Sequence, residues 1–499
     1  MLAIFITSLI PSDLELSHFI HTSCNIPIKF VMLIWIRVLF FLLMYSTFWR
    51  RVESEELTSE YVSFLEQFNP NIQENIVSAF NNEMARNHRR KNFIKTVHNL
   101  DTILLSLDNT KIELSKLTLE WLPDFKVINL GVNLCKLCLD IDFKLDDLPV
   151  SGNYEVNNVA LQNVLPVSSN GAITVVYTDV TVKGRVGLLI QGDSFVPENY
   201  DVDYTWNSEV SVSYFINRDT KVEAKVTRPT DDQIIAKTIW TQLKEVLTTI
   251  LKDQLKGVVV EYSVQESLAD EDEKLRQLAQ SQLTKANGLF DTLLCAAKDY
   301  LVAKDLRTIE TPPFEVLYRG KLSSTETGLF ESGNGYIKDL STLSRLSDLS
   351  LFEDERQLLV YGTLGMREFK HGYDSFKTKF EDNDLTGSLK AQVRGTEIFV
   401  KLSFEKSEES PQKTKVEKIE TRLLRDTAID TSGLGSLSWL IPTTQSWVLG
   451  HLRSTSMDIL LKQIEAAFSY AIEAEMKKTT TTGSDGDNSR LFWKSIFSK

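Results

Sequence analysis

Few residues of this 499-residue chain stand at the spacings that chemistry requires. Cys135 and Cys138 form a C-x-x-C pair, a spacing found in redox motifs and in half of a zinc site. No second Cys pair and no His pair occurs at ligand spacing, and the motif lies inside an alternating apolar run. We therefore interpret the two residues as core cysteines or as one local disulfide.

The histidines and serines carry no catalytic signature. Four histidines are isolated in the sequence: His88, His98, His371 and His451. None belongs to an H-E-x-x-H or G-x-S-x-G motif, and no Walker loop or G-x-G-x-x-G is present. In "GLGSLSW", Ser436 and Ser438 lack the flanking glycines of a nucleophile turn, so the segment predicts a turn before the last helix. We expect a protein that is not an enzyme and that needs no metal and no cofactor.

Composition and charge narrow the class of protein. The chain is 42% hydrophobic and 25% charged with a formal net charge of -13, which is typical of a globular protein. Its length predicts two or more domains. Residues 1–51 hold two acids and four bases, which leaves 66 acids and 51 bases, or -15, for the remainder. So acidic a body is unsuited to nucleic acid, which binds basic surfaces. Four cysteines are too few for a disulfide scaffold.

An apolar run at residues 30–49, "FVMLIWIRVLFFLLMYSTFW", has two interpretations. One is a signal peptide that begins at Met32, with a charged region ending at Arg37 and an apolar region after it. The other is a signal anchor that spans a bilayer and contacts the membrane. Arg37 leaves an apolar stretch too short to span, so we favour a secreted protein over one tethered by residues 30–49. Residues 1–52 are then an upstream extension and signal segment.

Apolar periodicity predicts one set of elements in residues 53–262. A helix follows "VESEE", with a break or a second start at Asn69-Pro70. The run "VINLGVNLCKLCLDIDFKL" alternates in two opposite phases, which predicts one strand that changes face at a bulge. Further strands lead to a long helix over residues 234–255, whose start is marked by the T-x-x-Q capping box of Thr230 and Gln233.

The same order recurs in residues 281–477. The strand that begins at Gly387 follows the one that begins at Gly171 by 216 positions (387 minus 171), and a closing helix is expected over about residues 446–476. We interpret this as an internal duplication joined by a linker helix at residues 263–280. Residues 478–499 read as a disordered tail.

This order of elements resembles the tubular lipid-binding superfamily. The group includes juvenile hormone-binding and takeout-like arthropod proteins, group-seven mite allergens and bactericidal/permeability-increasing proteins. The resemblance is carried by "GNYEVNNVALQNVLPVSSNGAITVVYTDVTVKGRVGLL", "GNGYIKDLSTLSRLSDLSL", "GTLGMREFKHGYDSF" and "TSGLGSLSWL", and the group-seven allergen-like proteins look most similar. It implies an α+β fold of two tandem modules, each a strongly curved antiparallel sheet wrapped around a long apolar helix.

The resemblance also implies an apolar tunnel between each helix and its sheet. The tunnel would sequester a hydrophobic small molecule such as a lipid, a fatty acid or a terpenoid-like compound, by burial of apolar surface. The expected lining residues lie on the two long helices: Ile239, Leu243, Leu247, Ile250, Leu251, Leu460, Ile464 and Phe468. The alternative is a structural or protein-interaction module of the same fold, whose tunnel is filled by its own side chains.

Overall fold

The computed structural model describes residues 59–91, 97–107, 110–120, 123–158, 168–207, 210–215, 229–268, 272–319, 327–405 and 414–481. Residues 57–499 form one compact unit. The expected signal segment at residues 30–49 and the expected tail beyond Thr481 lie outside the described residues. Within those residues, no helix is both long and apolar enough to cross a bilayer.

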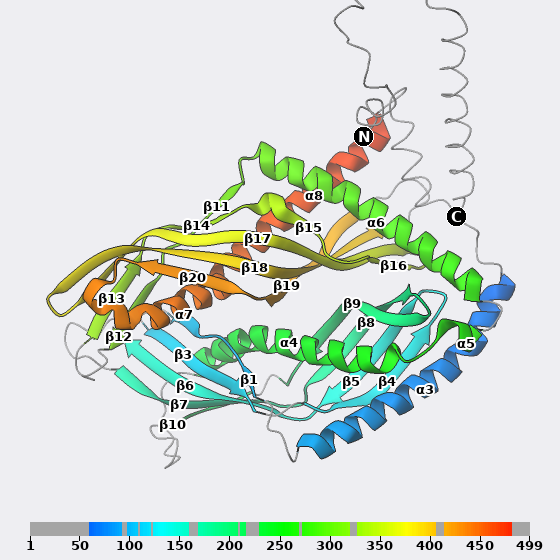
Figure 1. The fold of residues 1–499 in the computed structure, drawn as a ribbon, viewed down its shortest axis with the longest axis horizontal. Helices are drawn as coiled ribbons and strands as arrows, with labels where there is room; N and C mark the ends of the chain where they lie inside the picture. The colour runs from blue at the N-terminus through cyan, green and yellow to red at the C-terminus, as the bar shows by residue number, and fades with distance from the viewer. Residues whose placement is uncertain are drawn as a thin grey trace, which may run out of the picture. The chain divides into compact units, whose positions relative to one another are not determined.

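The N-terminal half of this unit, residues 59–268, combines two antiparallel sheets with two long helices (Figure 1). One sheet has the order β1-β3-β6-β7-β10 with β2 on β3, and the other has the order β4-β5-β8-β9. The elements are α3 (Ser59–Lys91), β1 (His98–Asn99), β2 (Ile103–Leu107), β3 (Thr110–Leu119), β4 (Phe125–Asn133), β5 (Cys138–Leu145), β6 (Leu148–Asn158), β7 (Ser168–Tyr177), β8 (Thr181–Gln191), β9 (Ser194–Thr205), β10 (Ser211–Phe215), α4 (Pro229–Val259) and α5 (Val264–Leu268).

The C-terminal half, residues 272–481, is built on one larger antiparallel sheet whose centre is the long pair β17 and β18. Its elements are α6 (Asp272–Ala303), β11 (Thr308–Thr311), β12 (Glu315–Arg319), β13 (Thr327–Ser332), β14 (Gly335–Lys338), η4 (Leu340–Thr342), β15 (Leu343–Arg345), β16 (Ser350–Glu353), β17 (Gln357–Phe380), β18 (Asn383–Glu405), β19 (Thr414–Leu424), β20 (Thr427–Ser432), η5 (Gly435–Leu440), α7 (Ile441–His451), the π-helical turn η6 (Leu452–Ser456) and α8 (Met457–Thr481).

Helix α4 is buried over much of its circumference. Large apolar side chains recur on it at every fourth position from Ile235 to Leu255, and all of them are buried. They pack with residues of β3 to β9 and of α3 in a single core cluster. Because burial contributes about 25 cal/mol per Å² of apolar surface, this stripe makes a large contribution to the stability of the N-terminal half.

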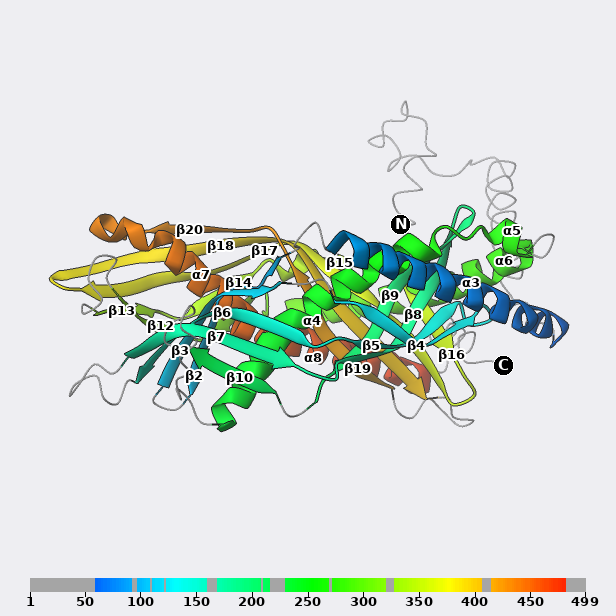
Figure 2. The same ribbon diagram turned by 90° about the horizontal axis from the view of Figure 1, so that it is seen from below.

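The C-terminal half has two large core clusters along β17 and β18. At one end the strands pack against α6 and α8, where Phe290 and Phe468 lie 5.3 Å apart between ring centres. At the other end they pack against α7, where Trp447 is fully buried beside Phe330. Figure 2 shows α7 lying along β20 and β18 at this end. The described chain is thus a sheet-rich α+β protein with open, curved sheets.

Three local predictions are wrong. The run expected to be one bulged strand is a hairpin: β4 and β5 pair with each other across a turn at residues 134–137, in which Leu137 has a positive φ of 47°. A hairpin reverses the apolar phase just as a bulge does. Helix α3 continues through Pro70 without a break. Helix α4 begins at Pro229, a favourable first residue, so Thr230 lies inside the first turn and not at the N-cap.

Of the two interpretations of Cys135 and Cys138, the structure confirms core cysteines. Cys135 and Cys138 are both free thiols, so the local disulfide is not formed. Cys138 is buried in a small cluster with Phe352, Tyr361 and other side chains of the C-terminal half. Burial raises the pKa of its thiol to about 12, which keeps it protonated and unreactive.

The burial of α4 predicts a strong response to truncation of its apolar stripe. Leu247→Ala should lower the free energy of unfolding by about 2–5 kcal/mol, because it leaves a void at a fully buried position. Urea denaturation followed by tryptophan fluorescence measures the change. Ile234→Ala is the control: this residue is 42% exposed on the same helix, so its truncation should cost less than about 0.5 kcal/mol. Equal losses from both variants would contradict the packing of the stripe.

Candidate functional site

The structure buries all eight side chains that the sequence places on the tunnel wall. Ile250 lines one of the cavities at the boundary between the N-terminal and C-terminal halves. The other seven pack in the two cores: Ile239, Leu243, Leu247 and Leu251 from α4, and Leu460, Ile464 and Phe468 from α8. The space around these seven residues is therefore filled by protein side chains in the described structure. Their contact with a ligand stays a prediction.

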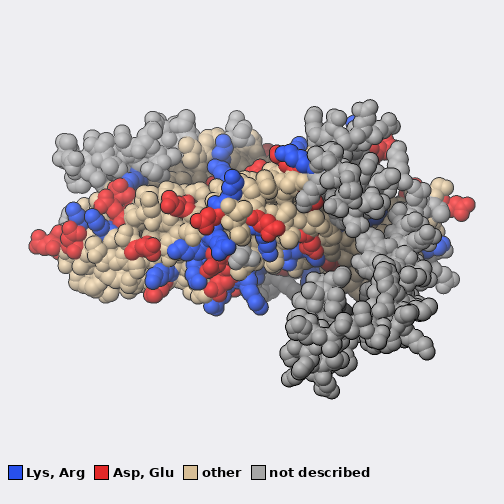
Figure 3. Space-filling model, turned by 90° about the horizontal axis from the view of Figure 1, so that it is seen from above, with Lys and Arg blue, Asp and Glu red and all other residues tan. Residues whose placement is uncertain are grey.

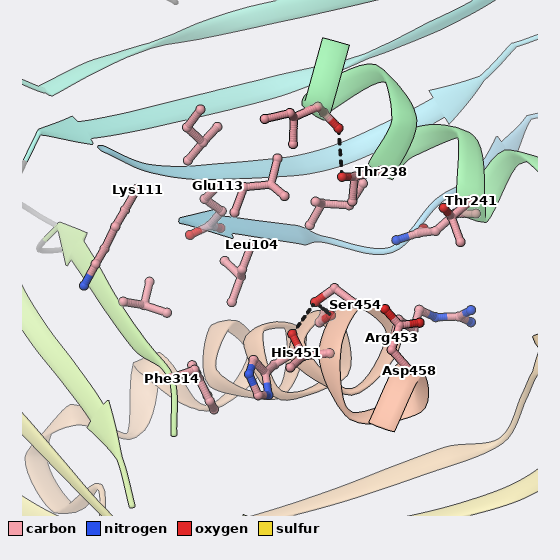
Figure 4. A pocket seen from close by; sticks show the side chains of 18 of the residues that line it. Leu104, Lys111, Glu113, Thr238, Thr241, Phe314, His451, Arg453, Ser454 and Asp458 are labelled. Carbon is pink, nitrogen blue, oxygen red and sulfur yellow. Dashed lines mark hydrogen bonds between the residues drawn. The ribbon is translucent and has the colours of Figure 1, made fainter. Parts of the chain in front are cut away.

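The largest of these boundary cavities, the first cavity, has a volume of about 790 Å³. β2, β3 and α4 form its N-terminal wall, while β12 with the loop before it, α7 and η6 form its C-terminal wall. Figure 4 shows Leu104 on β2, Thr238 on α4 and Phe314 just before β12 around the same space.

The lining of the first cavity is amphipathic. Its apolar part consists of Ile103, Leu104, Leu105, Ile112, Ile234, Pro313, Phe314, Val316 and Leu317. Hydroxyl groups from Thr238, Thr241, Ser454 and Thr455 and several charged side chains complete the wall. Thr238 and Ser454 each donate to the carbonyl four residues earlier in their own helix, at 2.9 Å in both cases, so their oxygen lone pairs remain able to accept.

Glu113 is a half-buried acidic residue on β3 in this wall. Trp447 Nε1 donates a hydrogen bond to its Oε2 at 3.0 Å, across the boundary between the halves. Burial, more than the nearby Glu155, raises the pKa of Glu113 to about 7. At neutral pH the group therefore populates both its neutral and its charged form.

An ion pair also connects the two walls of the first cavity. Lys111 Nζ lies 2.6 Å from Glu315 Oε1, which again joins the two halves. The first cavity thus has charges of both signs, and its acidic and basic side chains are largely matched. Figure 3 shows that acidic and basic side chains are also mixed over the middle of one outer face of the molecule.

Arg453 occupies the junction of the cavities. It lies in the π-helical turn η6, a rare conformation that is frequent at functional sites. Its guanidinium donates to Glu245 Oε2 at 2.8 Å and to the Leu424 carbonyl at 2.9 Å, and it also pairs with Asp101. Burial raises the pKa of Glu245, although Arg453 opposes the shift.

Two further cavities adjoin this junction. The second cavity, of about 710 Å³, lies on the other side of Arg453 and Glu245 between α4, β1 and the end of β19. A smaller cavity of about 240 Å³ is lined by β9, β19 and α8 and includes the same two residues. The Arg453–Glu245 pair is therefore a shared partition between neighbouring spaces.

A histidine cluster adjoins the first cavity, and one of its members, His451, lines the cavity. His371 Nε2 is 3.1 Å from Ser456 Oγ, and Tyr373 Oη is 2.6 Å from His451 Nδ1. Burial lowers the pKa of His371 to about 3 and that of His451 to about 4, so both rings are neutral at physiological pH. His371 Nδ1 has no hydrogen-bond partner among the described residues.

This geometry lacks what nucleophilic catalysis requires. Ser456 is completely buried, so a substrate in the cavity cannot contact it, and no carboxylate orients His371 within the part of the chain that is described. The described residues also contain no group of three or more His, Cys, Asp or Glu side chains that could hold a metal ion. We interpret the cluster as a polar support for η6.

Sequence reasoning missed Glu113, Glu245 and Arg453. A usable signal was present on α4, where Thr238, Gln242, Glu245 and Thr249 form a polar stripe at helical spacing beside the apolar one. All four line one of the two large cavities. No comparable signal marks Glu113, because its partner Trp447 is 334 positions away.

Comparison with known proteins gives weak structural similarity. No protein-family model matches the chain, and no curated protein sequence matches it. Takeout 1 of Epiphyas postvittana aligns at 15% identity over 34% of this chain and 81% of its own, with a TM-score of 0.23. A lipopolysaccharide binding protein aligns at 9% identity over 79% and 89% of the two chains, with a TM-score of 0.20. P47 of Clostridium botulinum E1 aligns at 8% identity over 74% and 83%, with a TM-score of 0.10. Scores this low carry no argument about family or function.

The raised pKa of Glu113 predicts a pH-dependent stability. Between its ordinary pKa of 4.5 and about 7, the folded state keeps a proton that the unfolded chain releases, so this residue's contribution to stability falls as pH rises. Glu113→Gln removes that contribution. Its free energy of unfolding relative to wild type should rise by up to about 3 kcal/mol between pH 4.5 and 8.

The control for this prediction is Glu381→Gln, which alters a carboxylate in the exposed turn between β17 and β18. Urea denaturation at pH 4.5, 6 and 8 provides the comparison. Parallel pH profiles for wild type and Glu113→Gln would show that Glu113 is not desolvated in solution.

Proposed function

We propose that this protein binds a hydrophobic small molecule, such as a lipid, a fatty acid or a terpenoid-like compound, in the first cavity. The observation that carries the proposal is the cavity itself, about 790 Å³ with a large apolar wall. Ligand pockets usually measure about 300–1,000 Å³ and combine apolar walls with a few polar groups. A ligand that hides about 200 Å² of apolar surface here would gain about 5 kcal/mol from burial.

We further propose that the chain is a tandem member of the tubular lipid-binding superfamily. Separate cores support this proposal, since one cluster draws its residues from positions 61–275 and the next from positions 286–472. The first module would cover residues 53–262 and the second residues 281–477, with helix α6 crossing the expected boundary at residue 280. In this proposal the protein is secreted, acts as a carrier and catalyses no reaction.

A structural or protein-interaction role is the second candidate, and one observation favours it. Seven of the eight expected tunnel residues are packed against other side chains of the described residues and line neither large cavity, as a filled tube requires. The two candidates differ in what the first cavity contains in solution.

Solvent extraction distinguishes the candidates. The full chain is expressed in a secreting eukaryotic host, purified and extracted with organic solvent, and the extract is analysed by mass spectrometry. A carrier should release stoichiometric lipid, or should take up a fluorescent fatty-acid or neutral apolar probe. A folded protein that releases no lipid and binds neither probe would favour the interaction role.

Filling the first cavity should abolish binding there. Leu104 is half-buried on β2 and faces the cavity, so Leu104→Trp places an indole in the space that a ligand would occupy. We expect the affinity for a neutral fluorescent probe to fall about tenfold or more. Ile128→Trp is the control, because Ile128 is 58% exposed on β4 and lines neither the first nor the second cavity.

Both variants are first compared with wild type by thermal unfolding, which excludes a general loss of structure. Unchanged probe affinity in a folded Leu104→Trp variant would place the binding site elsewhere.

A further inference from the structure

The second cavity has an apolar wall and an acidic rim. Leu100, Val246, Ile250, Leu423 and Leu424 supply the wall, in a space of about 710 Å³. This wall can hold an alkyl chain or a ring system in the same way as the first cavity. The two cavities differ in the charges that surround them.

Carboxylates dominate the charged lining of the second cavity. The acids are Glu83, Asp101, Glu245, Asp253 and Glu261, whereas Arg453 is the single Lys or Arg side chain among the described lining residues. Arg453 is already paired with Glu245 and Asp101. Asp253 and Glu261 have no ion-pair partner in the part of the chain that is described. Among the described residues, the cavity lining therefore keeps an uncompensated negative charge.

Two polar side chains in the same lining have buried atoms without hydrogen-bond partners within the described ranges. Gln254 is only 7% exposed, and neither its Nε2 nor its Oε1 has a partner among the described residues. His98 Nε2 is a second buried atom for which the described part of the chain offers no hydrogen-bond partner, and burial lowers the pKa of this imidazole. An unmade hydrogen bond of this kind costs about 1–3 kcal/mol, which a polar ligand group in the cavity would recover.

We infer that the second cavity binds amphiphiles with a cationic head group, of the alkylammonium class, in preference to carboxylates of the same chain length. The apolar wall takes the chain, the acidic rim takes the positive charge, and Gln254 Oε1 can accept an N–H from the head group. A carboxylate would face Asp253 and Glu261 with like charge. This inference rests on the proposed function, because it assumes that the protein binds hydrophobic molecules, and it adds a second site with its own ligand class.

Three probes of equal chain length test the inference: dodecylamine, dodecanol and dodecanoic acid. Binding to the full chain is measured by displacement of a neutral fluorescent probe at pH 7.4 in 50 mM salt, below the aggregation concentration of each compound. We expect the amine to bind about tenfold more tightly than the acid, with the alcohol between them. The preference should shrink at 500 mM salt, because exposed charges are screened.

The outcomes separate the inference from the proposed function. If the alcohol binds but the acid binds as tightly as the amine, the inference is overturned and the proposed function stands. If none of the three probes binds, both are overturned. The Leu104→Trp variant should keep the amine preference, because it blocks the first cavity only.

Charge-neutralising variants test whether the preference for the amine arises in the second cavity. Asp253→Asn combined with Glu261→Gln should weaken amine binding about fivefold and leave alcohol binding unchanged, since both side chains are exposed on the rim. Asp382→Asn combined with Asp384→Asn is the matched control, which changes the net charge equally in the exposed turn and start of β18. Equal losses from the two double variants would show a general charge effect and would overturn the site.

Discussion

Twist in a long antiparallel strand pair is the constraint on which the C-terminal half depends. β17 has 24 residues and β18 has 23, and they pair along nearly their whole length. Paired strands of L-amino acids twist in one direction, so a ladder this long cannot stay flat. Its two ends therefore face different partners: α6 and α8 pack at one end, and α7 packs at the other. The long hairpin is a single element that serves two cores.

The boundary between the halves is polar because curved surfaces meet there incompletely. Lys401 pairs with Asp201 at 2.8 Å, Arg422 donates to the Tyr200 carbonyl at 3.1 Å, and Lys252 pairs with Glu397 at 3.3 Å. Charged groups in such a boundary have to be paired, since an unpaired buried charge is very costly. The pairs fix how the halves meet, and the cavities remain where the pairs hold the walls apart. The cavities and the assembly of the halves thus have the same structural origin.

Apolar periodicity was sufficient to predict the long helices and the strand-rich halves, because burial on one face leaves a direct trace in sequence. The same pattern could not separate a hairpin from a bulge. At residues 134–137 the phase reverses at a turn, whereas in β18 it reverses within one strand at Gly395, which has a positive φ of 73°. The cavities were not predictable, because their walls join residues from both halves and no local pattern encodes that pairing. The polar stripe of α4 was the one sequence feature that could have indicated these cavities.

The π-helical turn η6 has a consequence for which sequences this fold can accept. A π-turn contains one residue more than an α-helical turn, and each residue advances an α-helix by about 100°. Removing a single residue from Leu452–Ser456 would restore regular helix geometry and would even improve local hydrogen bonding. Because the extra residue is accommodated inside the turn, the helix beyond it would keep its direction, and Leu460, Ile464 and Phe468 would still face α6 and the sheet. The turn therefore holds one residue more than the packing of α8 requires, and a chain that lacks this residue could keep the same core.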